Sequence, residues 1–148
     1  MRFFRHAVLS LAIAAGCTVL TPAIAAAANS AAAPCGSSAA ACVSISRQQA
    51  WLMNGGRVTY GPTPVKTGMP GYRTPAGTFT VLWKNRHHRS KTYNNAPMPY
   101  AVFFTNSGIA FHQGSLSGQS HGCVRMGQNA AATFFKNLSV GQVVQVVS

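Results

Sequence analysis

Residues 111–125 read FHQGSLSGQSHGCVR and hold one thiol, two imidazoles and one guanidinium among glycines and serines. A thiol attacks a carbonyl carbon only as the thiolate, and its free pKa of about 8.5 requires a base or a cation nearby. Either His112 or His121 could be that base for Cys123. A buried, inert cysteine is the alternative, but His121 and Arg125 are poor core residues. The stretch therefore predicts a cysteine active site.

The chain contains no Asp and no Glu in 148 residues. Aspartic proteolysis, paired-carboxylate glycoside hydrolysis, phosphoryl transfer through carboxylate-held Mg²⁺ and a Ser-His-Asp triad are therefore excluded from this chain. If a histidine acts as the base, a backbone carbonyl or a neutral side chain must fix its tautomer. We expect a backbone carbonyl in this role, and we expect no cofactor and no metal.

The N-terminus has two arginines among its first five residues, then an apolar run at 7–20 and an Ala-rich stretch at 23–28. This order is typical of a secretory signal peptide. We therefore assign residues 1–28 to a signal peptide, residues 29–41 to an Ala/Ser-rich spacer and residues 42–148 to one domain. The protein is expected to be secreted and associated with the cell wall. A retained membrane helix is the alternative.

The use of cysteine agrees with export. Cys35 and Cys42 flank a short Ser/Ala loop, and we expect them to form a disulfide that contributes about 2.5 kcal/mol. Cys123 is then a free thiol. Cys17 lies in the signal peptide, where Ala14-Ala15-Gly16-Cys17 loosely resembles a lipoprotein cleavage site without the usual leucine. Lipidation at Cys17 therefore stays open as an alternative.

The formal charge of +12 indicates anionic partners. Export favours anionic cell-wall polymers over nucleic acid, with membrane contact peripheral at most, and we expect a monomer. A basic cluster is either a solvated loop or a wall-binding segment. It consists of Lys84, Arg86, His87, His88, Arg89 and Lys91. Because no acidic side chains can pair with the cations, stability should rise with salt.

Alternating patterns and turn residues predict a mainly β domain with one short helix. Strands are expected at 42–46, 49–53, 57–60, 78–84, 100–105, 109–112 and 142–147. The helix is expected at 129–138, with Ala130, Phe134, Phe135 and Leu138 as its buried face. The polar stretch 85–99 is predicted to be a long loop at a rim or lid. Trp51 and Trp83 are expected in the core.

The segment SHGCVRM at 120–126, with His112 and Gly114 upstream at a strand end, resembles the L,D-transpeptidase catalytic domain, also called the YkuD domain. RTPAGTF at 73–79 and APMPY at 96–100 are also similar to family segments, in the same order. The resemblance runs from about residue 42 to residue 147. It implies a mixed β-sandwich-like fold.

The resemblance also implies an activity. Such an enzyme cleaves a peptidoglycan tetrapeptide stem between its third residue and D-Ala, then passes the acyl group through a cysteine to an amine of a second stem, which forms a 3–3 cross-link. By position, Cys123 would be the nucleophile and His112 the general base, oriented by the carbonyl of Gln113 or Gly114.

The remaining site residues are also implied by the resemblance. His121 would line the site, and backbone N–H groups around Gly122 and Cys123 would form the oxyanion hole. Arg125 would support the loop or meet a substrate carboxylate. The expected substrate-binding residues are Met98, Tyr100, Gln113, Gly114 and Arg125.

Three other functions compete with this interpretation. An L,D-carboxypeptidase would use the same acyl-enzyme with water as acceptor. A non-catalytic cationic wall-binding protein would need only the charge. A metal site would use His112, His121 and Cys123, but their spacing is not that of a regular zinc site.

Overall fold

The computed structural model describes residues 32–148, so the predicted signal peptide lies outside the described residues. Within that range, one sheet of nine strands has the order β4-β9-β1-β2-β3-β8-β7-β6-β5. The strands are β1 (Ala41–Ser44), β2 (Gln49–Asn54), β3 (Arg57–Lys66), β4 (Gly77–Thr80), β5 (Trp83–Arg89), β6 (Pro97–Phe103), β7 (Ala110–Gln113), β8 (Val124–Met126) and β9 (Val143–Val147). The helix is α1 (Gln128–Asn137). The predicted mainly β single domain with one short helix is confirmed.

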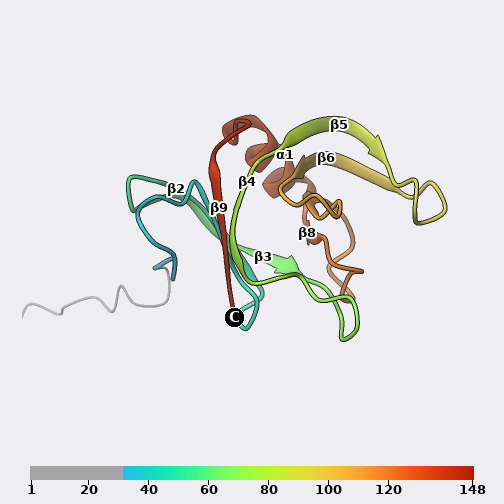
Figure 1. Cartoon of the computed structure of the whole chain (residues 1–148), viewed down its shortest axis with the longest axis horizontal. Coiled ribbons are helices and arrows are strands. Elements are labelled where there is room, and N and C mark those ends of the chain that lie inside the picture. Colours follow the sequence, from blue (N-terminus) through green and yellow to red (C-terminus); the bar gives the residue numbers. More distant parts are fainter. Residues whose placement is uncertain (1–31) are drawn as a thin grey trace, which may run out of the picture.

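The sheet is mixed and curls back on itself. The pairs β1–β9 and β7–β8 are parallel, whereas the other neighbours run antiparallel. The successive strands β4 and β5 lie at opposite edges. The two residues between them bridge both edges, because the Val81 N–H donates to Gln142 O and the Leu82 N–H donates to Phe103 O. In Figure 1, β5 and β6 extend away from β2 and β9, with α1 between the two arms.

The main core lies between α1 and the inner face of the curled sheet. Phe134 of α1 packs against Phe111 of β7, with ring centroids 5.1 Å apart, and Phe104 packs on Phe111 at 4.9 Å. Leu138, just after the helix, is also buried, whereas Phe135 is only partly buried. The helix prediction is therefore correct within one residue at each end.

Two sequence predictions about the middle of the chain are wrong. The expected single strand at 78–84 is two strands, β4 and β5. The expected loop at 85–99 is mostly a hairpin of β5 and β6, and only residues 90–96 connect the two strands. The hairpin escapes the apolar pattern because β5 is an edge strand whose polar side chains face solvent.

The two tryptophans differ in their surroundings. Trp51 is fully buried in a small cluster with Cys42 and Met53, beside the Cys35–Cys42 disulfide, which is formed as predicted. Trp83 is 43% exposed and stacks on Phe103 at 3.8 Å, so the expectation of a core position for Trp83 is wrong. Within residues 32–148, no helix is long and apolar enough to cross a membrane.

Candidate active site

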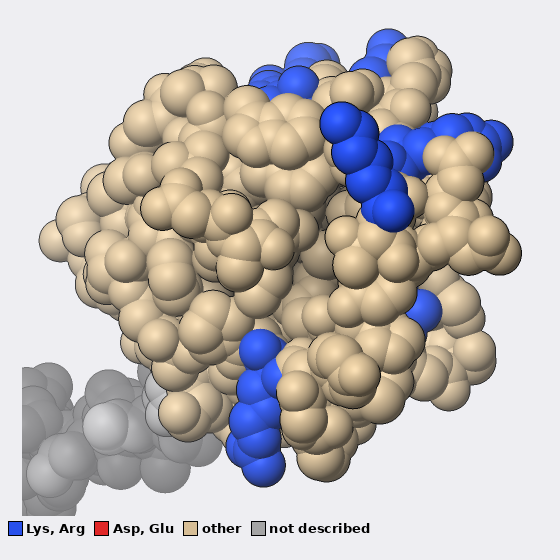
Figure 2. Space-filling view, turned by 45° about the vertical axis from the view of Figure 1, so that its right-hand side comes forward, with Lys and Arg blue, Asp and Glu red and all other residues tan. Residues whose placement is uncertain are grey.

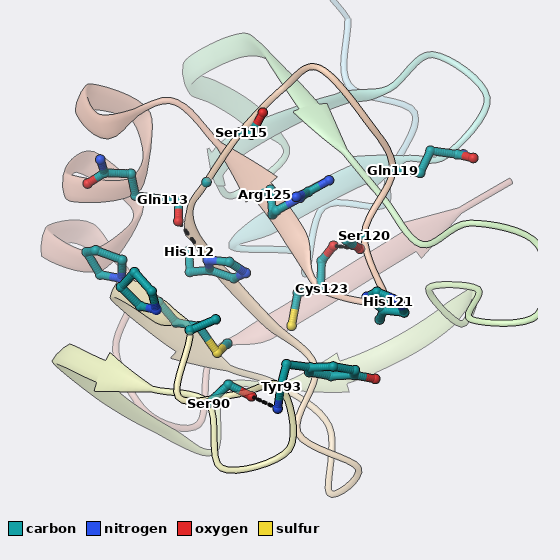
Figure 3. Close-up of a pocket in the computed structure, with 15 residues that line it drawn as sticks. Ser90, Tyr93, His112, Gln113, Ser115, Gln119, Ser120, His121, Cys123 and Arg125 are labelled. Atoms are coloured by element: carbon teal, nitrogen blue, oxygen red, sulfur yellow. Dashed lines mark hydrogen bonds between the residues drawn. The ribbon is translucent and has the colours of Figure 1, made fainter.

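A cavity of about 510 Å³ opens beside the free cysteine, between the β5–β6 hairpin and the loop that joins β7 to β8 (Figure 3). It brings together most of the predicted site residues. It is lined by Ser90, Tyr93, Ala96, Pro97, Met98, Pro99, His112, Gln113, Gly114, Ser115, Gln119, Ser120, His121, Cys123 and Arg125.

His112 lies near the end of β7, and only 7% of its surface is exposed. Its Nδ1 lies 2.7 Å from the carbonyl oxygen of Gln113. A carbonyl oxygen only accepts hydrogen bonds, so Nδ1 carries the proton and the lone pair of Nε2 is left free. A backbone carbonyl thus fixes the tautomer, as expected for a chain without carboxylates.

The pKa of His112 lies below its ordinary value of 6.5. Burial is the main cause, and the positive charges of Arg125 and His88 add to it, while the hydrogen bond to the Gln113 carbonyl acts in the opposite direction. The imidazole is therefore neutral near pH 7, which is the form that can accept a proton.

Cys123 immediately precedes β8, and its side chain and the His112 ring point into the same cavity (Figure 3). The pKa of Cys123 is raised above its ordinary value because burial disfavours the thiolate. A hydrogen bond with the backbone of Ala110 and the charge of Arg125 lower it again, but by less. In the structure as it stands, burial therefore favours the protonated thiol.

The short parallel pair β7–β8 brings the segment that carries His112 beside the segment that carries Cys123. Phe111 pairs with Val124, and His112 pairs with Arg125. Because Cys123 directly precedes Val124, the loop that carries Cys123 ends beside the strand that carries His112. The sequence analysis did not predict β8, whose three residues are too few to give a periodic signal.

Ser120 fixes the backbone on both sides of the Gly122–Cys123 peptide bond. Its Oγ accepts a hydrogen bond from the Gly122 N–H at 3.0 Å and donates one to the Cys123 carbonyl at 2.5 Å. The Gly122 N–H is therefore already occupied. Among the described residues, none accepts a hydrogen bond from the Cys123 N–H. Of these two backbone N–H groups, only that of Cys123 is therefore without a partner among the described residues. Gly122 itself is buried and lies outside the cavity lining.

Arg125 lies across the loop between β7 and β8. Its Nη2 donates to the Gly118 carbonyl, and its aliphatic part packs against Gly114, where an added Cβ would lie 2.7 Å from the Arg125 Cδ. Its buried Nε has no hydrogen-bond partner among the described residues. Arg125 therefore supports the loop, and a side chain at position 114 would displace the aliphatic part of Arg125.

His121 is exposed and lies between two tyrosines. Its ring meets the Tyr72 ring edge-on at 4.7 Å and stacks on the Tyr93 ring at 4.8 Å. Tyr93 belongs to the 90–96 connection, where the Ser90 Oγ accepts a hydrogen bond from its N–H. The sequence analysis missed Tyr93, because nothing in the sequence pairs residue 93 with residue 121.

The two residues predicted from the segment APMPY lie in different places. Met98 lines the cavity and packs against Cys123. Tyr100 does not line it: its ring packs on Phe135 of α1 at 6.0 Å and under Arg86 at 5.3 Å. In a regular strand, residues 98 and 100 would share a face, but Tyr100 has a φ of +58°, which breaks the alternation. Tyr100 is thus outside the residues that line this cavity, and its predicted substrate contact stays a prediction.

The described residues contain no group of three His, Cys, Asp or Glu side chains that could hold a metal ion. His112, His121 and Cys123 thus do not converge as ligands.

The comparison with known proteins agrees with this geometry. The family model of the L,D-transpeptidase catalytic domain (YkuD) matches residues 38–146. No curated protein matches the chain.

Three solved structures share the fold. An L,D-transpeptidase (Yku) from Stackebrandtia nassauensis is 32% identical with a TM-score of 0.68, over 73% of this chain and 54% of that one. An L,D-transpeptidase from Mycobacterium tuberculosis H37Rv is 25% identical with a TM-score of 0.66, over 72% and 56%. LD transpeptidase LdtMt1 in complex with imipenem is 28% identical with a TM-score of 0.65, over 71% and 56%. This chain thus spans little more than half the length of these relatives. Nevertheless, the family model covers most of it, and the chain belongs to the L,D-transpeptidase catalytic-domain (YkuD) family.

Proposed function

We propose that this protein is a peptidoglycan L,D-transpeptidase that forms 3–3 cross-links between tetrapeptide stems through an acyl-enzyme on Cys123. One observation carries the proposal. A neutral imidazole, with Nδ1–H held by the Gln113 carbonyl, and a free thiol line the same cavity. This is the pair that acyl transfer through a thioester needs, in a chain that has no carboxylate to offer instead.

The raised pKa of Cys123 makes His112 a general base that acts during the attack. The thiol proton moves to Nε2 of His112 while Sγ bonds to the carbonyl carbon of the third stem residue. The bond from that carbon to the D-Ala nitrogen then breaks, and the nitrogen takes the proton from His112. In the second half, an amine of the acceptor stem attacks the thioester and gives a proton to His112. That proton returns to the sulfur as the thiolate leaves.

The negative charge that develops on the substrate carbonyl oxygen needs a donor. We assign this role to the Cys123 N–H, which has no partner among the described residues. A preorganised donor of this kind typically changes the rate by about 10²–10³-fold.

A second cavity favours transfer to a stem over hydrolysis. It measures about 370 Å³, is also lined by Cys123, His121 and Tyr93, and continues toward Trp83. The thiol is therefore bordered by two cavities of similar kind, as a reaction with two peptide substrates requires. A carboxypeptidase, which uses water, needs only one.

Export and wall association complete the proposal. The Cys35–Cys42 disulfide supports an oxidising, extracytoplasmic compartment. Three exposed cations of the β5–β6 hairpin, Arg86, Arg89 and Lys91, supply a face for anionic wall polymers. Figure 2 brings the hairpin side of Figure 1 forward and displays basic side chains gathered there.

The test is to incubate the protein with a disaccharide-tetrapeptide and to identify the products by mass spectrometry. We expect loss of D-Ala together with a dimer linked through two third residues. Release of D-Ala with only monomeric tripeptide would make the protein a carboxypeptidase. An unchanged substrate would favour the wall-binding alternative. The Cys123→Ala variant is the control: it should retain the fold and form no product.

Imipenem provides a probe of the first half-reaction alone. LdtMt1 has been solved in complex with imipenem. We propose that imipenem acylates Cys123 of this chain, because its strained lactam carbonyl can accept the thiol and its ring nitrogen can take the proton from His112. Intact-protein mass spectrometry measures the adduct.

A further inference from the structure

We infer that Thr74 is a positioning residue for the oxyanion donor: its hydroxyl group fixes the direction of the Cys123 N–H through the peptide bond between Gly122 and Cys123. The inference deepens the proposed function and rests on it, because it takes the Cys123 N–H as the donor to the developing oxyanion. Thr74 does not line the cavity. It therefore acts through the backbone.

Thr74 is buried, with 3% of its surface exposed, and its hydroxyl makes two hydrogen bonds. It accepts one from the Gly68 N–H at 2.9 Å and lies 2.6 Å from the Gly122 carbonyl oxygen. A carbonyl oxygen has no hydrogen to give, so the single hydroxyl hydrogen of Thr74 points at Gly122. The direction of both bonds is thus settled.

The Gly122 carbonyl and the Cys123 N–H belong to one planar trans peptide group, in which they point in opposite directions. Holding the oxygen at one end therefore sets the N–H at the other end. Donation to the carbonyl also polarises the amide and strengthens its N–H as a donor. Gly122 has a φ of +118°, a backbone conformation that glycine adopts without steric strain and other residues rarely adopt. The orientation of the Gly122–Cys123 peptide group is therefore a property of the folded loop.

The neighbouring backbone groups are held by other means. Ser120 occupies the Gly122 N–H and the Cys123 carbonyl, and Thr74 occupies the Gly122 carbonyl. Of the four polar groups of these two residues, the Cys123 N–H is the one left without a partner among the described residues. Thr74 is therefore the side chain that controls the far end of the donor's own peptide group.

The segment that carries Thr74 is closely joined to the nucleophile loop. The Met69 N–H donates to the Ser120 carbonyl at 2.9 Å, and the Ser120 N–H donates to the Thr67 carbonyl at 2.9 Å. At Gly68, an added Cβ would lie 1.9 Å from the Tyr72 carbonyl oxygen. Because this turn has no room to shift, Thr74 is a fixed point for the Gly122 peptide.

The experiment compares Thr74→Val, Thr74→Ser and the control Thr67→Val. Thr67 is fully buried on the same segment and loses a comparable hydrogen bond, from the Gln48 Nε2 at 2.6 Å, but it does not touch the Gly122 carbonyl. Two rates are measured for each protein: acylation of Cys123 by imipenem, which develops an oxyanion, and alkylation by iodoacetamide, which does not.

We expect Thr74→Val to slow acylation about 10- to 100-fold while its alkylation rate stays within about threefold of wild type. Thr74→Ser, which keeps the hydroxyl, should acylate within about threefold of wild type, and Thr67→Val should do the same. If Thr74→Val does not fold, Thr74→Ala replaces it. It also lacks the hydroxyl, and we expect acylation about 10- to 100-fold slower than wild type.

Three results would overturn the inference. Thr74→Val could acylate at the wild-type rate, its acylation and alkylation could fall by the same factor, or Thr67→Val could lose as much acylation as Thr74→Val. Because imipenem reports thioester formation alone, a wild-type protein that acylates but forms no cross-link would contradict the proposed function and leave the role of Thr74 intact.

Discussion

Neither the loop around Cys123 nor the β5–β6 hairpin has a carboxylate to contact its polar and cationic side chains. The two regions use different groups for these contacts. At the site, backbone carbonyls hold polar side chains in one orientation: Gln113 holds His112, and Gly118 holds Arg125. In the hairpin, the Lys84 ammonium group lies over the Phe135 ring and donates a hydrogen bond to the Leu138 carbonyl. The first arrangement fixes the orientation of side chains at the site. The second leaves the hairpin with a positively charged surface.

This difference predicts where substitutions matter. At the site, a changed side chain disturbs a directional contact in a buried environment, so effects on rate should be large and insensitive to salt. On the hairpin, a changed cation alters a solvated charge, so effects should be small, confined to binding and screened by salt.

The largest effect is expected from His112→Gln. In the proposed mechanism this removes the general base, and acylation by imipenem should fall about 10²–10⁴-fold. The matched control is His87→Gln, an exposed imidazole on β5 whose loss should leave the rate within about twofold. Intact-protein mass spectrometry measures both rates. Equal rates in the two variants would erase the distinction between the two regions.

The next effect is on pH dependence. His112 must be neutral to accept the thiol proton, and its pKa lies below 6.5, chiefly because of burial. The acylation rate should therefore rise with pH along a curve whose midpoint is below pH 6.5. At pH 6.5 the protein should keep more than half of its maximal rate. The curve is measured as the rate of imipenem acylation at a series of pH values across the acid range. A midpoint above 7 would contradict a buried neutral base.

A smaller effect is expected from the hairpin charges. The triple variant Arg86→Gln, Arg89→Gln, Lys91→Gln should bind poly(glycerol phosphate) about tenfold more weakly at low salt and acylate normally. The matched control removes the same charge elsewhere, through Arg47→Gln, Arg57→Gln and Lys136→Gln, three exposed cations off the hairpin. Binding is measured by titration calorimetry. Similar losses in both triples would mean that net charge, not the hairpin, attracts the polymer.

The smallest effect concerns the whole molecule. With a formal charge of +12 and no acidic side chains, the cations repel one another. Raising NaCl from about 20 mM to about 0.5 M should therefore raise the Tm by a few degrees, as followed by circular dichroism. Imipenem acylation by the folded protein should change little over the same range. A Tm that falls with salt would show that repulsion is not the dominant electrostatic effect.

Much of the fold could be predicted from the sequence because most elements carry a local pattern. The helix and the buried strands β1, β2, β6, β7 and β9 have apolar residues at regular spacing, and they were found within a few residues. The hairpin was missed because an edge strand buries little of itself. The short strand β8 was missed because three residues are too few to give a periodic signal.

The candidate site divides along a similar line. The residues that carry chemical groups are close together in sequence, so Cys123, His112 and the Gln113 carbonyl could be proposed from the motif. Thr74 and Tyr93 could not, because they meet the loop from segments 48 and 28 residues away. That Tyr100 does not line the cavity could not be predicted either, because it depends on the left-handed backbone conformation of this one residue.

The sequence by itself determined that no acidic side chain takes part, so that a backbone carbonyl or a neutral side chain must orient the base, and it indicated which thiol is free. The tertiary structure decided the directions of the pKa shifts, which N–H remains unoccupied and which side chains border the cavity. The physical reason is that composition is a property of the chain, whereas desolvation and hydrogen-bond occupancy depend on neighbours brought together by folding.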